Sequence, residues 1–201
     1  AVHCACNVTT NLRAAQPAQD AQDPELALLE DNPPADFLKI DFARGRPEPT
    51  FNTHIGNLYV KRGEKGTRDE FVMGFRVQQH MCNPAGGLHG GMMMTVADLV
   101  GTMGGGTLVG LRKFLPTVSM TFDFVAPAKV GDWVEGRAVV VRQTRSLLFT
   151  DISLTVGEER FLRASQIAKI PSGEGQAFGK ARLDRGAAAP TAAAPTTATS
   201  R

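Results

Sequence analysis

The chain has 201 residues and a formal net charge of +2, which suits one ordinary globular domain with flanking segments. A charge so close to neutral gives no electrostatic reason to expect nucleic acid as a partner. The three cysteines do not form the spaced framework of a disulfide scaffold, and this usage fits a reducing compartment. No basic segment followed by an apolar one opens the sequence, so we expect no signal peptide and a cytoplasmic protein.

The two ends of the chain differ from its middle in composition. Residues 1–33 are rich in Ala, Gln, Asn, Asp and Pro with little apolar periodicity, which predicts a largely unstructured N-terminal tail. Residues 173–201 end in the low-complexity run AAAPTAAAPTTATSR, which predicts a disordered tail. Residues 34–172 are therefore the predicted folded domain.

The first half of this domain is predicted to contain two helices and two strands. Pro34–Phe42 has the pattern of a short amphipathic helix. Strands are expected over Ile55–Arg62 and over Glu70–Gln78, where large apolar side chains alternate. An apolar helix is expected over Gly90–Gly104, and three consecutive glycines are expected to end it.

The second half is predicted to be four strands joined by short turns. They are expected over Thr117–Val125, Trp133–Arg142, Leu147–Val156 and Arg160–Ile170. In the first of these, Val118, Met120, Phe122 and Phe124 are expected on one face, and Thr117, Ser119, Thr121 and Asp123 on the other. Short turns between strands indicate an antiparallel meander, and a helix that is apolar nearly all round must be covered by the sheet. The predicted fold class is α+β, with an antiparallel sheet of about six strands around one central helix.

The apolar run Gly90–Leu111 is long enough to cross a bilayer. It contains consecutive glycines and a central Asp98, and an Asp at the centre of a membrane helix costs roughly 2.5–3.5 kcal/mol. A helix buried inside a soluble domain is the better interpretation, so no membrane association is expected.

Asp98 is the only side chain between Gly86 and Leu111 that is charged at neutral pH. A carboxylate on an apolar helix is costly unless hydrogen-bond donors or a function compensate for it. Helical spacing places it on one face with Met94 and Thr102. Two interpretations stay open: a structural Asp bonded to a neighbouring strand, or a general base or nucleophile.

The segment Gly86–Gly91 reads GGLHGG and runs directly into the predicted helix. The first amides of a helix lack internal partners and lie at the positive end of its dipole. Because Gly90 has no side chain, a ligand oxygen can approach this backbone closely. The segment is either an oxyanion site or a turn that only permits close packing. An amide donor together with a carboxylate points to acyl-transfer chemistry.

Other polar residues near the glycines have weaker cases. Asn83 can donate to a carbonyl and His89 can hold the loop or donate, although each alone is more typical of a loop-structuring residue. Cys82 has no evident base partner and is predicted to be an inert thiol. Only half of a metal site is present, in the N-terminal tail, and no metal is predicted: His3, Cys4 and Cys6. The motifs of nucleophile-elbow hydrolases, P-loops and dinucleotide-binding folds are absent.

The segment HMCNPAGGLHGGMMMTVADLVGTMGG combines an Asn, a Gly-rich approach, His-Gly-Gly and a helical Asp. It resembles the signature of hotdog-fold acyl-CoA thioesterases of the phenylacetyl-CoA (PaaI-like) type, within the hydroxybenzoyl-CoA thioesterase superfamily. The run PTVSMTFDFVAPAKVGDWVEGRAVVVRQTRSLLFTDISL is similar to the strands that follow the helix in that family. The resemblance covers about residues 51–170 and implies a hotdog fold that hydrolyses acyl-CoA.

The resemblance implies roles for matching residues. Asp98 matches the family's catalytic acid, which acts as general base on water or as nucleophile. Gly90 matches the residue whose backbone N–H forms the oxyanion hole. Asn83 matches a residue that polarises or places the thioester, and His89 matches the motif His. Thr117 matches a residue that helps to orient water.

A second set of residues is expected to contact the CoA part of the substrate. The turn from Arg142 to Ser146 matches a family stretch that does so, and its two arginines suit phosphates, although a solvated hairpin turn is equally consistent. Ser119 is also a rival to Thr117. The set is Ser119, Phe124, Arg142, Gln143, Thr144, Arg145 and Ser146. CoA is part of the substrate, so no separate cofactor is expected.

The resemblance also implies a homodimer, in which Asp98 of one subunit works with the Gly90 amide of the other, and dimers that pair into tetramers. The leading hypothesis is an acyl-CoA thioesterase. The alternative is a non-catalytic acyl-CoA-binding hotdog protein. A hydratase or dehydratase would need a His and an acid in another arrangement. Aryl-acetyl, medium-chain and long-chain acyl groups all stay open.

Overall fold

The computed structural model describes residues 29–43, 48–61 and 70–173. Most of the two predicted tails, residues 1–28 and 174–201, lies outside this part of the chain, so their expected lack of structure stays a prediction. The proposed division of the chain at residues 34 and 172 stays a prediction as well.

Seven strands form one sheet in the order β1-β2-β3-β5-β6-β7-β4, and each neighbouring pair is antiparallel. Their bounds are Phe37–Lys39 (β1), Tyr59–Lys61 (β2), Val72–Arg76 (β3), Thr117–Phe124 (β4), Trp133–Gln143 (β5), Leu147–Val156 (β6) and Glu159–Lys169 (β7). Among the described residues, β4 pairs only with β7 and is therefore an edge strand. The predicted α+β class is confirmed, with seven strands where about six were expected.

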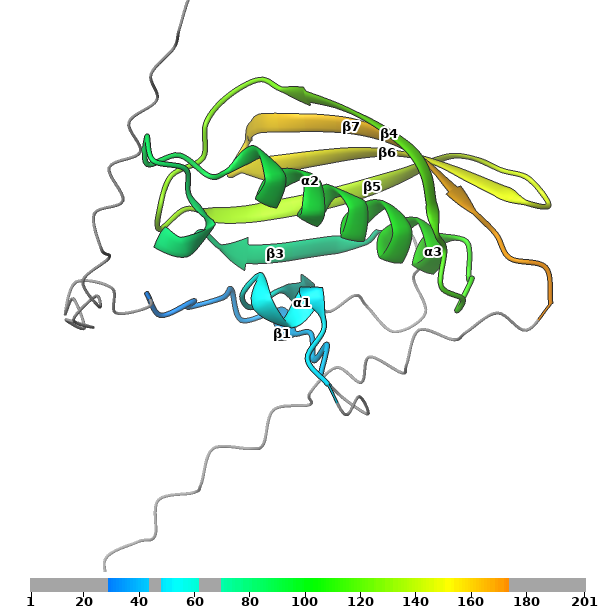
Figure 1. Ribbon diagram of the computed structural model, residues 1–201, viewed down its shortest axis with the longest axis horizontal. Helices are drawn as coiled ribbons and strands as arrows, with labels where there is room; N and C mark the ends of the chain where they lie inside the picture. The colour runs from blue at the N-terminus through cyan, green and yellow to red at the C-terminus, as the bar shows by residue number, and fades with distance from the viewer. Residues whose placement is uncertain (1–28, 44–47, 62–69, 174–201) are drawn as a thin grey trace, which may run out of the picture.

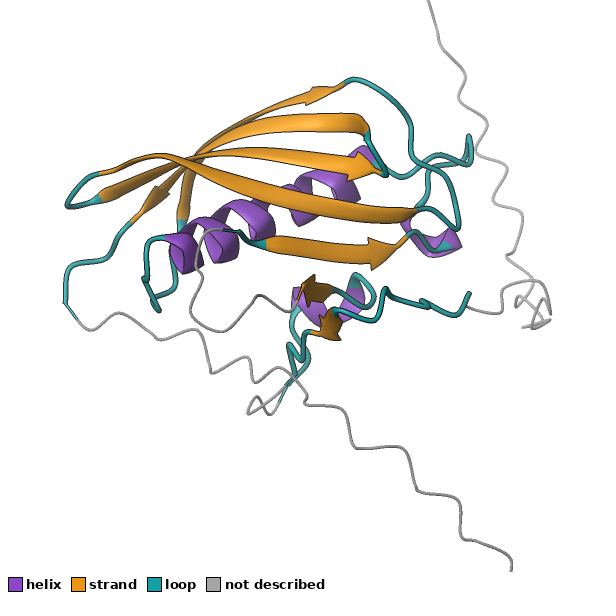
Figure 2. Ribbon diagram, turned by 180° about the vertical axis from the view of Figure 1, so that it is seen from behind, coloured by secondary structure: helices purple, strands orange, loops and turns teal. Residues whose placement is uncertain are grey.

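One central helix of 19 residues lies along one face of the sheet. It consists of α2 (Gly90–Leu99), the π-helical turn η3 (Val100–Gly104) and α3 (Gly105–Leu108). Figures 1 and 2 show β5, β6, β7 and β4 curving over this helix. Two short helices, α1 (Phe51–His54) and η2 (Gln79–Met81), come before it. No helix in the described part of the chain is both long and apolar enough to cross a membrane.

The glycines Gly104–Gly106 do not end the helix, contrary to the prediction. They are buried inside it, and a Cβ at Gly104 would lie 2.6 Å from Phe71 Cδ1. Their role is to let the helix backbone approach the sheet closely. The helix ends instead before Gly110, whose φ of 72° belongs to a Schellman cap.

Residues 34–42 do not form the expected amphipathic helix. Phe37–Lys39 is instead β1, which pairs with β2. The ring of Phe37 packs edge-on against Trp133, with centroids 5.2 Å apart. So short a helix is marginal by itself, and pairing with the sheet outweighs the weak local pattern.

The alternation expected along β4 is interrupted at Val118. The pairing with β7 shifts between Thr117 and Ser119, which inserts one extra residue as a β-bulge. Thr117 therefore lines the same pocket as Met120 and Phe122, whereas Ser119 does not. The prediction that Thr117 shares a face with Ser119 is wrong, and the bulge is what turns the Thr117 hydroxyl toward α2.

Asp31 anchors the first described segment to the end of β3. Its carboxylate accepts hydrogen bonds from Tyr59 Oη at 2.8 Å and from Gln78 Nε2 at 3.0 Å. Arg76 Nε donates to the Asp31 carbonyl at 3.0 Å, and its guanidinium lies 5.3 Å from the Trp133 ring centroid. Burial, and then the hydrogen bond to Asp31, raise the pKa of Tyr59.

Candidate active site

Asp98 is held by two strands at the middle of the central helix. Thr117 Oγ1 of β4 donates to Asp98 Oδ1 at 2.5 Å, and Gln166 Nε2 of β7 donates to the same oxygen at 2.8 Å. Gln166 Nε2 also donates to Thr117 Oγ1 at 3.0 Å, which closes a triangle. Asp98 Oδ2 accepts no hydrogen bond from the residues that the structure describes. One carboxylate oxygen is therefore fixed, and the other is available to a water molecule or a substrate.

An open pocket of about 340 Å³ lies beside Asp98. Its lining comes from α1, α2 and β4, and consists of Phe51, Asn52, Met94, Thr95, Asp98, Leu99, Thr117, Met120 and Phe122. Asp98 is the only ionisable residue among the described residues of this lining. Met94 and Phe51 are 41 % and 66 % exposed, so the pocket offers an apolar wall to a ligand.

One backbone amide at the amino end of α2 has no hydrogen-bond acceptor among the described residues. His89 is the N-cap residue, and its Nδ1 accepts a hydrogen bond from Gly91 N–H at 2.9 Å. The amides of His89 and Met92 also have acceptors. Of residues 88–93, only Gly90 has an N–H without a hydrogen-bond partner among the described residues. This amide lies at the positive end of the helix dipole and can bind an oxygen.

Asn83 orders the loop that precedes the helix. Its Oδ1 accepts hydrogen bonds from Ala85 N–H at 2.9 Å and from Gly87 N–H at 3.3 Å. These two hydrogen bonds give Asn83 Oδ1 the loop-structuring role. Asn83 Nδ2 has no acceptor within the described part of the chain, so it remains available to donate to a carbonyl.

The two halves of the predicted site lie at different points along the helix. At a rise of 1.5 Å per residue, Gly90 and Asp98 are about 12 Å apart along the axis. Phe124 lies at the Gly90 end, where its Cε1 is 3.6 Å from the position that a Cβ at Gly90 would take. Thr117, at the other end of β4, lies beside Asp98. Within one chain, a single carbonyl group cannot reach both the Gly90 amide and the Asp98 carboxylate.

The residues predicted to contact CoA do not line the pocket beside Asp98. Ser119 does not line the pocket. The Arg142–Ser146 segment comprises the last two residues of β5 and the β5–β6 turn, where Thr144 Oγ1 accepts from Leu147 N–H at 2.9 Å. Figure 1 shows this turn at the end of the sheet near α3, opposite the end where α2 begins. Contact between the turn and CoA stays a prediction.

Burial raises the pKa of the Cys82 thiol above its ordinary value. The thiol donates to the Gln78 carbonyl at 3.5 Å. A protonated thiol is a poor nucleophile, so these features agree with the predicted inert role.

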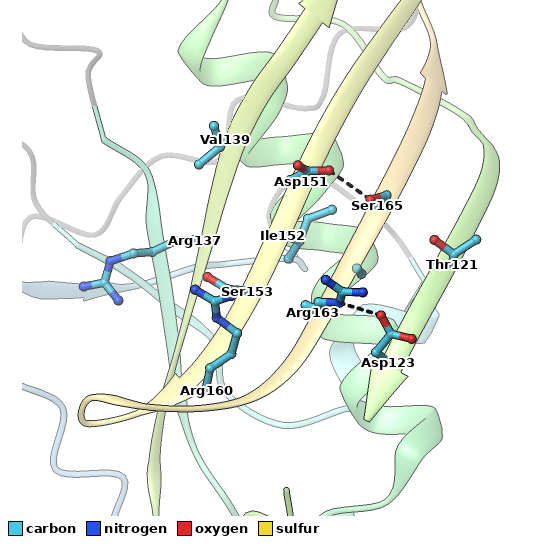
Figure 3. Close-up of a pocket in the computed structure, with 11 residues that line it drawn as sticks. Thr121, Asp123, Arg137, Val139, Asp151, Ile152, Ser153, Arg160, Arg163 and Ser165 are labelled. Atoms are coloured by element: carbon cyan, nitrogen blue, oxygen red, sulfur yellow. Dashed lines mark hydrogen bonds and ion pairs between the residues drawn. The ribbon is translucent and has the colours of Figure 1, made fainter. Parts of the chain in front are cut away.

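A second hollow, of about 360 Å³, lies on the outer face of the sheet, away from the central helix (Figure 3). Four of its polar side chains form two pairs. Arg163 Nε lies 2.6 Å from Asp123 Oδ2, and Ser165 Oγ donates to Asp151 Oδ1 at 2.9 Å. Because these contacts occupy groups that a ligand would need, the pocket beside Asp98 is the better candidate site.

Sequence reasoning does not identify Gln166, although it contacts Asp98 directly. Gln166 is 1 % exposed and lies on the inward face of β7 between the buried residues Ala164 and Ala168. A signal was available, because a polar group at an inward strand position must find a partner. Its partner is a carboxylate 68 positions away, which no local pattern reveals.

Residues 85–162 match the sequence profile of the thioesterase superfamily. Human acyl-coenzyme A thioesterase 13 is 34 % identical over 107 residues, which are 52 % of this chain and 72 % of the human protein. The crystal structure of zebrafish thioesterase superfamily member 2 has a TM-score of 0.55 and 23 % identity, and covers 65 % of this chain and 93 % of its own. A Streptococcus mutans UA159 protein bound to acetyl-CoA has a TM-score of 0.50 and 18 % identity, covering 64 % and 96 %.

The similarity of sequence includes the part of the chain that carries the helix. The matched residues 85–162 contain Gly90, Asp98 and Thr117. The solved structures share the arrangement of a sheet around one helix. The chain therefore belongs to the thioesterase superfamily and is a hotdog-fold thioester hydrolase.

Proposed function

We propose that the protein hydrolyses an acyl-CoA thioester to the free acid and CoA, with Asp98 as general base on water or as nucleophile. The observation that carries this proposal is the Asp98 carboxylate beside an apolar pocket, with Oδ1 held and Oδ2 uncommitted. Such an oxygen can take a proton from water or attack a carbonyl carbon. The relative named acyl-coenzyme A thioesterase 13 supports acyl-CoA as the substrate class.

The Gly90 amide would stabilise the negative charge that develops on the thioester oxygen. This amide has no acceptor among the described residues and lies at a helix N-terminus, where such charge is favoured. Asn83 Nδ2 is a second donor without a partner in the same part of the chain. His89 holds the helix start through its Nδ1 and so keeps the Gly90 N–H exposed to the site.

We further propose that two copies of the chain build each site. β4 is an edge strand, and its exposed side chains include Val118 at 60 % and Phe124 at 50 %. Unpaired strand edges readily pair with another strand. Antiparallel pairing of β4 with its own copy about the midpoint of the strand would set Thr117 opposite Phe124 of the second copy.

This pairing would bring the two halves of the site together. Thr117 bonds to Asp98 at one end of β4, and Phe124 covers Gly90 at the other end. Asp98 of one copy would therefore face the Gly90 N–H of the second copy. The smallest active unit is then a homodimer, and a tetramer rests on the family resemblance alone.

The CoA moiety is proposed to contact the β5–β6 turn. Arg142 and Arg145 are exposed there, and their guanidinium groups suit the phosphates of CoA. The Streptococcus mutans protein of the same fold is bound to acetyl-CoA. Gln143, Thr144, Ser146, Ser119 and Phe124 remain the other proposed contacts.

The acyl group is proposed to occupy the pocket beside Asp98. Its wall of Met94, Leu99, Met120 and Phe122 favours an apolar group, and methionine side chains adapt to different shapes. Rates measured with aryl-acetyl, medium-chain and long-chain CoA thioesters would identify which acyl group fits.

Replacing Asp98 with Asn tests the proposal. A thiol reagent follows CoA release from that panel of thioesters. We expect the Asp98→Asn variant to lose about 10²- to 10⁴-fold in rate, because the amide can neither accept a proton nor attack. Asp151→Asn is the matched control, since Asp151 bonds to Ser165 on the outer face of the sheet, and it should keep the parent rate.

Two results would contradict the proposal. One is a folded Asp98→Asn variant that stays within about threefold of the parent rate. The other is a parent protein that binds CoA thioesters without hydrolysing any of them, which would favour the non-catalytic binding protein instead.

A further inference from the structure

We infer that Gln166 is a positioning residue of this site: it fixes Asp98 and Thr117 in one arrangement. The inference rests on the proposed thioesterase function. Gln166 lies on β7, beyond residues 85–162 that match the superfamily profile. Its hydrogen bonds to Asp98 and Thr117 are the evidence for the positioning role.

The amide of Gln166 determines which acceptor receives the hydroxyl proton of Thr117. Nε2 donates to Asp98 Oδ1 at 2.8 Å and to Thr117 Oγ1 at 3.0 Å, with longer contacts of 3.4 Å to the Asp98 carbonyl and to Met120 Sδ. Because the Thr117 oxygen accepts from the amide, its own proton is directed to Asp98 Oδ1. The same carboxylate oxygen therefore receives two donors, and Asp98 Oδ2 is left to face the reaction.

The orientation of the Gln166 amide is itself fixed. Its side chain is 1 % exposed, and Oε1 accepts from Thr150 Oγ1 at 3.4 Å. A flipped amide would set Oε1 against the Asp98 carboxylate, an acceptor facing an acceptor. The buried amide thus has one satisfactory orientation, which is the one that donates to Asp98.

The central helix makes room for this amide. A Cβ at residue 101 would lie 2.0 Å from Gln166 Oε1, so Gly101 leaves the space that Gln166 fills. Gly101 belongs to the π-helical turn η3, which begins two residues after Asp98, and such turns are frequent at functional sites. Thr102 Oγ1 donates to the Asp98 carbonyl at 2.8 Å. The buried amide, the glycine and the irregular turn all meet at Asp98.

Two donors meet at Asp98 Oδ1, and hydrogen bonds to a carboxylate are stronger than those between neutral groups. The elements that contribute to the Asp98 pocket are α1, α2 and β4, and no other described residue in its lining is ionisable. β7 contributes the neutral Gln166 and β6 the neutral Thr150 behind it. Thr117 and Gln166 are therefore the described side chains that hold the Asp98 carboxylate in place.

Two variants of the full-length protein test the inference with one thioester that the parent hydrolyses. Gln166→Met keeps the length of the side chain without its donor. We expect kcat to fall about ten- to a hundredfold with KM changed less than about threefold, because the lost hydrogen bonds serve a charged group. Gln166→Glu keeps the size of the side chain but sets a carboxylate against Asp98 in place of the donor, and should lower kcat at least as much.

Gln78→Met is the matched control. Gln78 is also a buried glutamine, 5 % exposed, and its amide donates to Asp31 and to the Leu29 carbonyl. This variant loses a comparable buried amide away from Asp98. It should lower stability while leaving kcat and KM unchanged.

The outcomes separate this inference from the proposed function. If folded Gln166 variants keep the parent kcat, or if Gln78→Met lowers kcat equally, the positioning role is wrong although Asp98 can still be catalytic. If Asp98→Asn loses no activity, the proposed function is wrong, and the inference about Gln166 is wrong with it. If Gln166→Met does not fold, the kcat of Gln166→Glu alone tests the positioning role, because the glutamate side chain fills the same space.

Discussion

Gly90 contributes a single hydrogen-bond donor to the proposed chemistry, so its role can be tested by removing one proton. Gly90 is the first residue of α2, a position that tolerates proline. The preceding His89 has φ −66° and ψ 135°, which suits the residue before a proline. Gly90→Pro should therefore fold normally and lose about 10²- to 10³-fold in kcat, because an oxyanion donor is gone. Steady-state CoA release measures this loss.

Gly90→Ala is the control for this change. It keeps the N–H, and its Cβ would lie 3.6 Å from Phe124 Cε1, an ordinary contact. We expect it to stay within about threefold of the parent rate. Equal rates for the alanine and proline variants would show that the Gly90 amide takes no part.

Single residues differ in how much of their role the sequence reveals. Asp98 can be identified from the sequence because a lone charge in an apolar run is visible without coordinates. Thr117 follows from the family resemblance, but its contact with Asp98 depends on the bulge at Val118, which interrupts a regular alternation. Gln166 depends on the register of β7 against the helix, which only the folded chain sets.

Among the elements, the small sheet edge around β1 and β2 is stabilised by polar contacts as well as packing. Tyr59 Oη donates to Asp31 at 2.8 Å, and burial followed by this hydrogen bond raises the pKa of Tyr59. An unfolded tyrosine loses its proton near pH 10. The stabilisation from Tyr59 is therefore complete below about pH 10 and declines as the pH rises above it, because the unfolded chain then releases the proton first.

Urea unfolding of the parent and of Tyr59→Phe measures this effect. The single tryptophan, Trp133, lies 5.7 Å from the Tyr59 ring and reports unfolding by fluorescence. We expect the parent to be more stable by about 1–2 kcal/mol at pH 8, and this advantage to shrink between about pH 10 and 11. A difference that stays constant over that interval would contradict the assignment.

Long elements are predictable here and short ones are not. The strands β3 to β7 and the start of the central helix follow from alternating or continuous apolar runs. β1 is misread as a helix because its strand is three residues long and is specified by pairing with β2. The helix end is misread because Gly104–Gly106 are buried packing residues, whereas the capping glycine is Gly110. In each case tertiary contacts outweigh a local signal.

At the scale of the whole molecule, Gly90 and Asp98 of one chain lie too far apart along the central helix to act on the same carbonyl group. The family resemblance already predicts a site shared between subunits. The structure adds a physical reason for it, since β4 presents an open edge whose two ends carry the two halves of the site. The central claim is therefore that two chains together form one thioesterase site.

The activity of a mixed dimer tests this claim most directly. Asp98→Asn and Gly90→Pro chains with different affinity tags are co-expressed, and the heterodimer is isolated by sequential purification. If each site takes Asp98 from one chain and Gly90 from the other, one of its two sites is intact, so the heterodimer should have about half the CoA-releasing activity of the parent dimer. If each site lies within one chain, the isolated heterodimer will be as inactive as either variant alone.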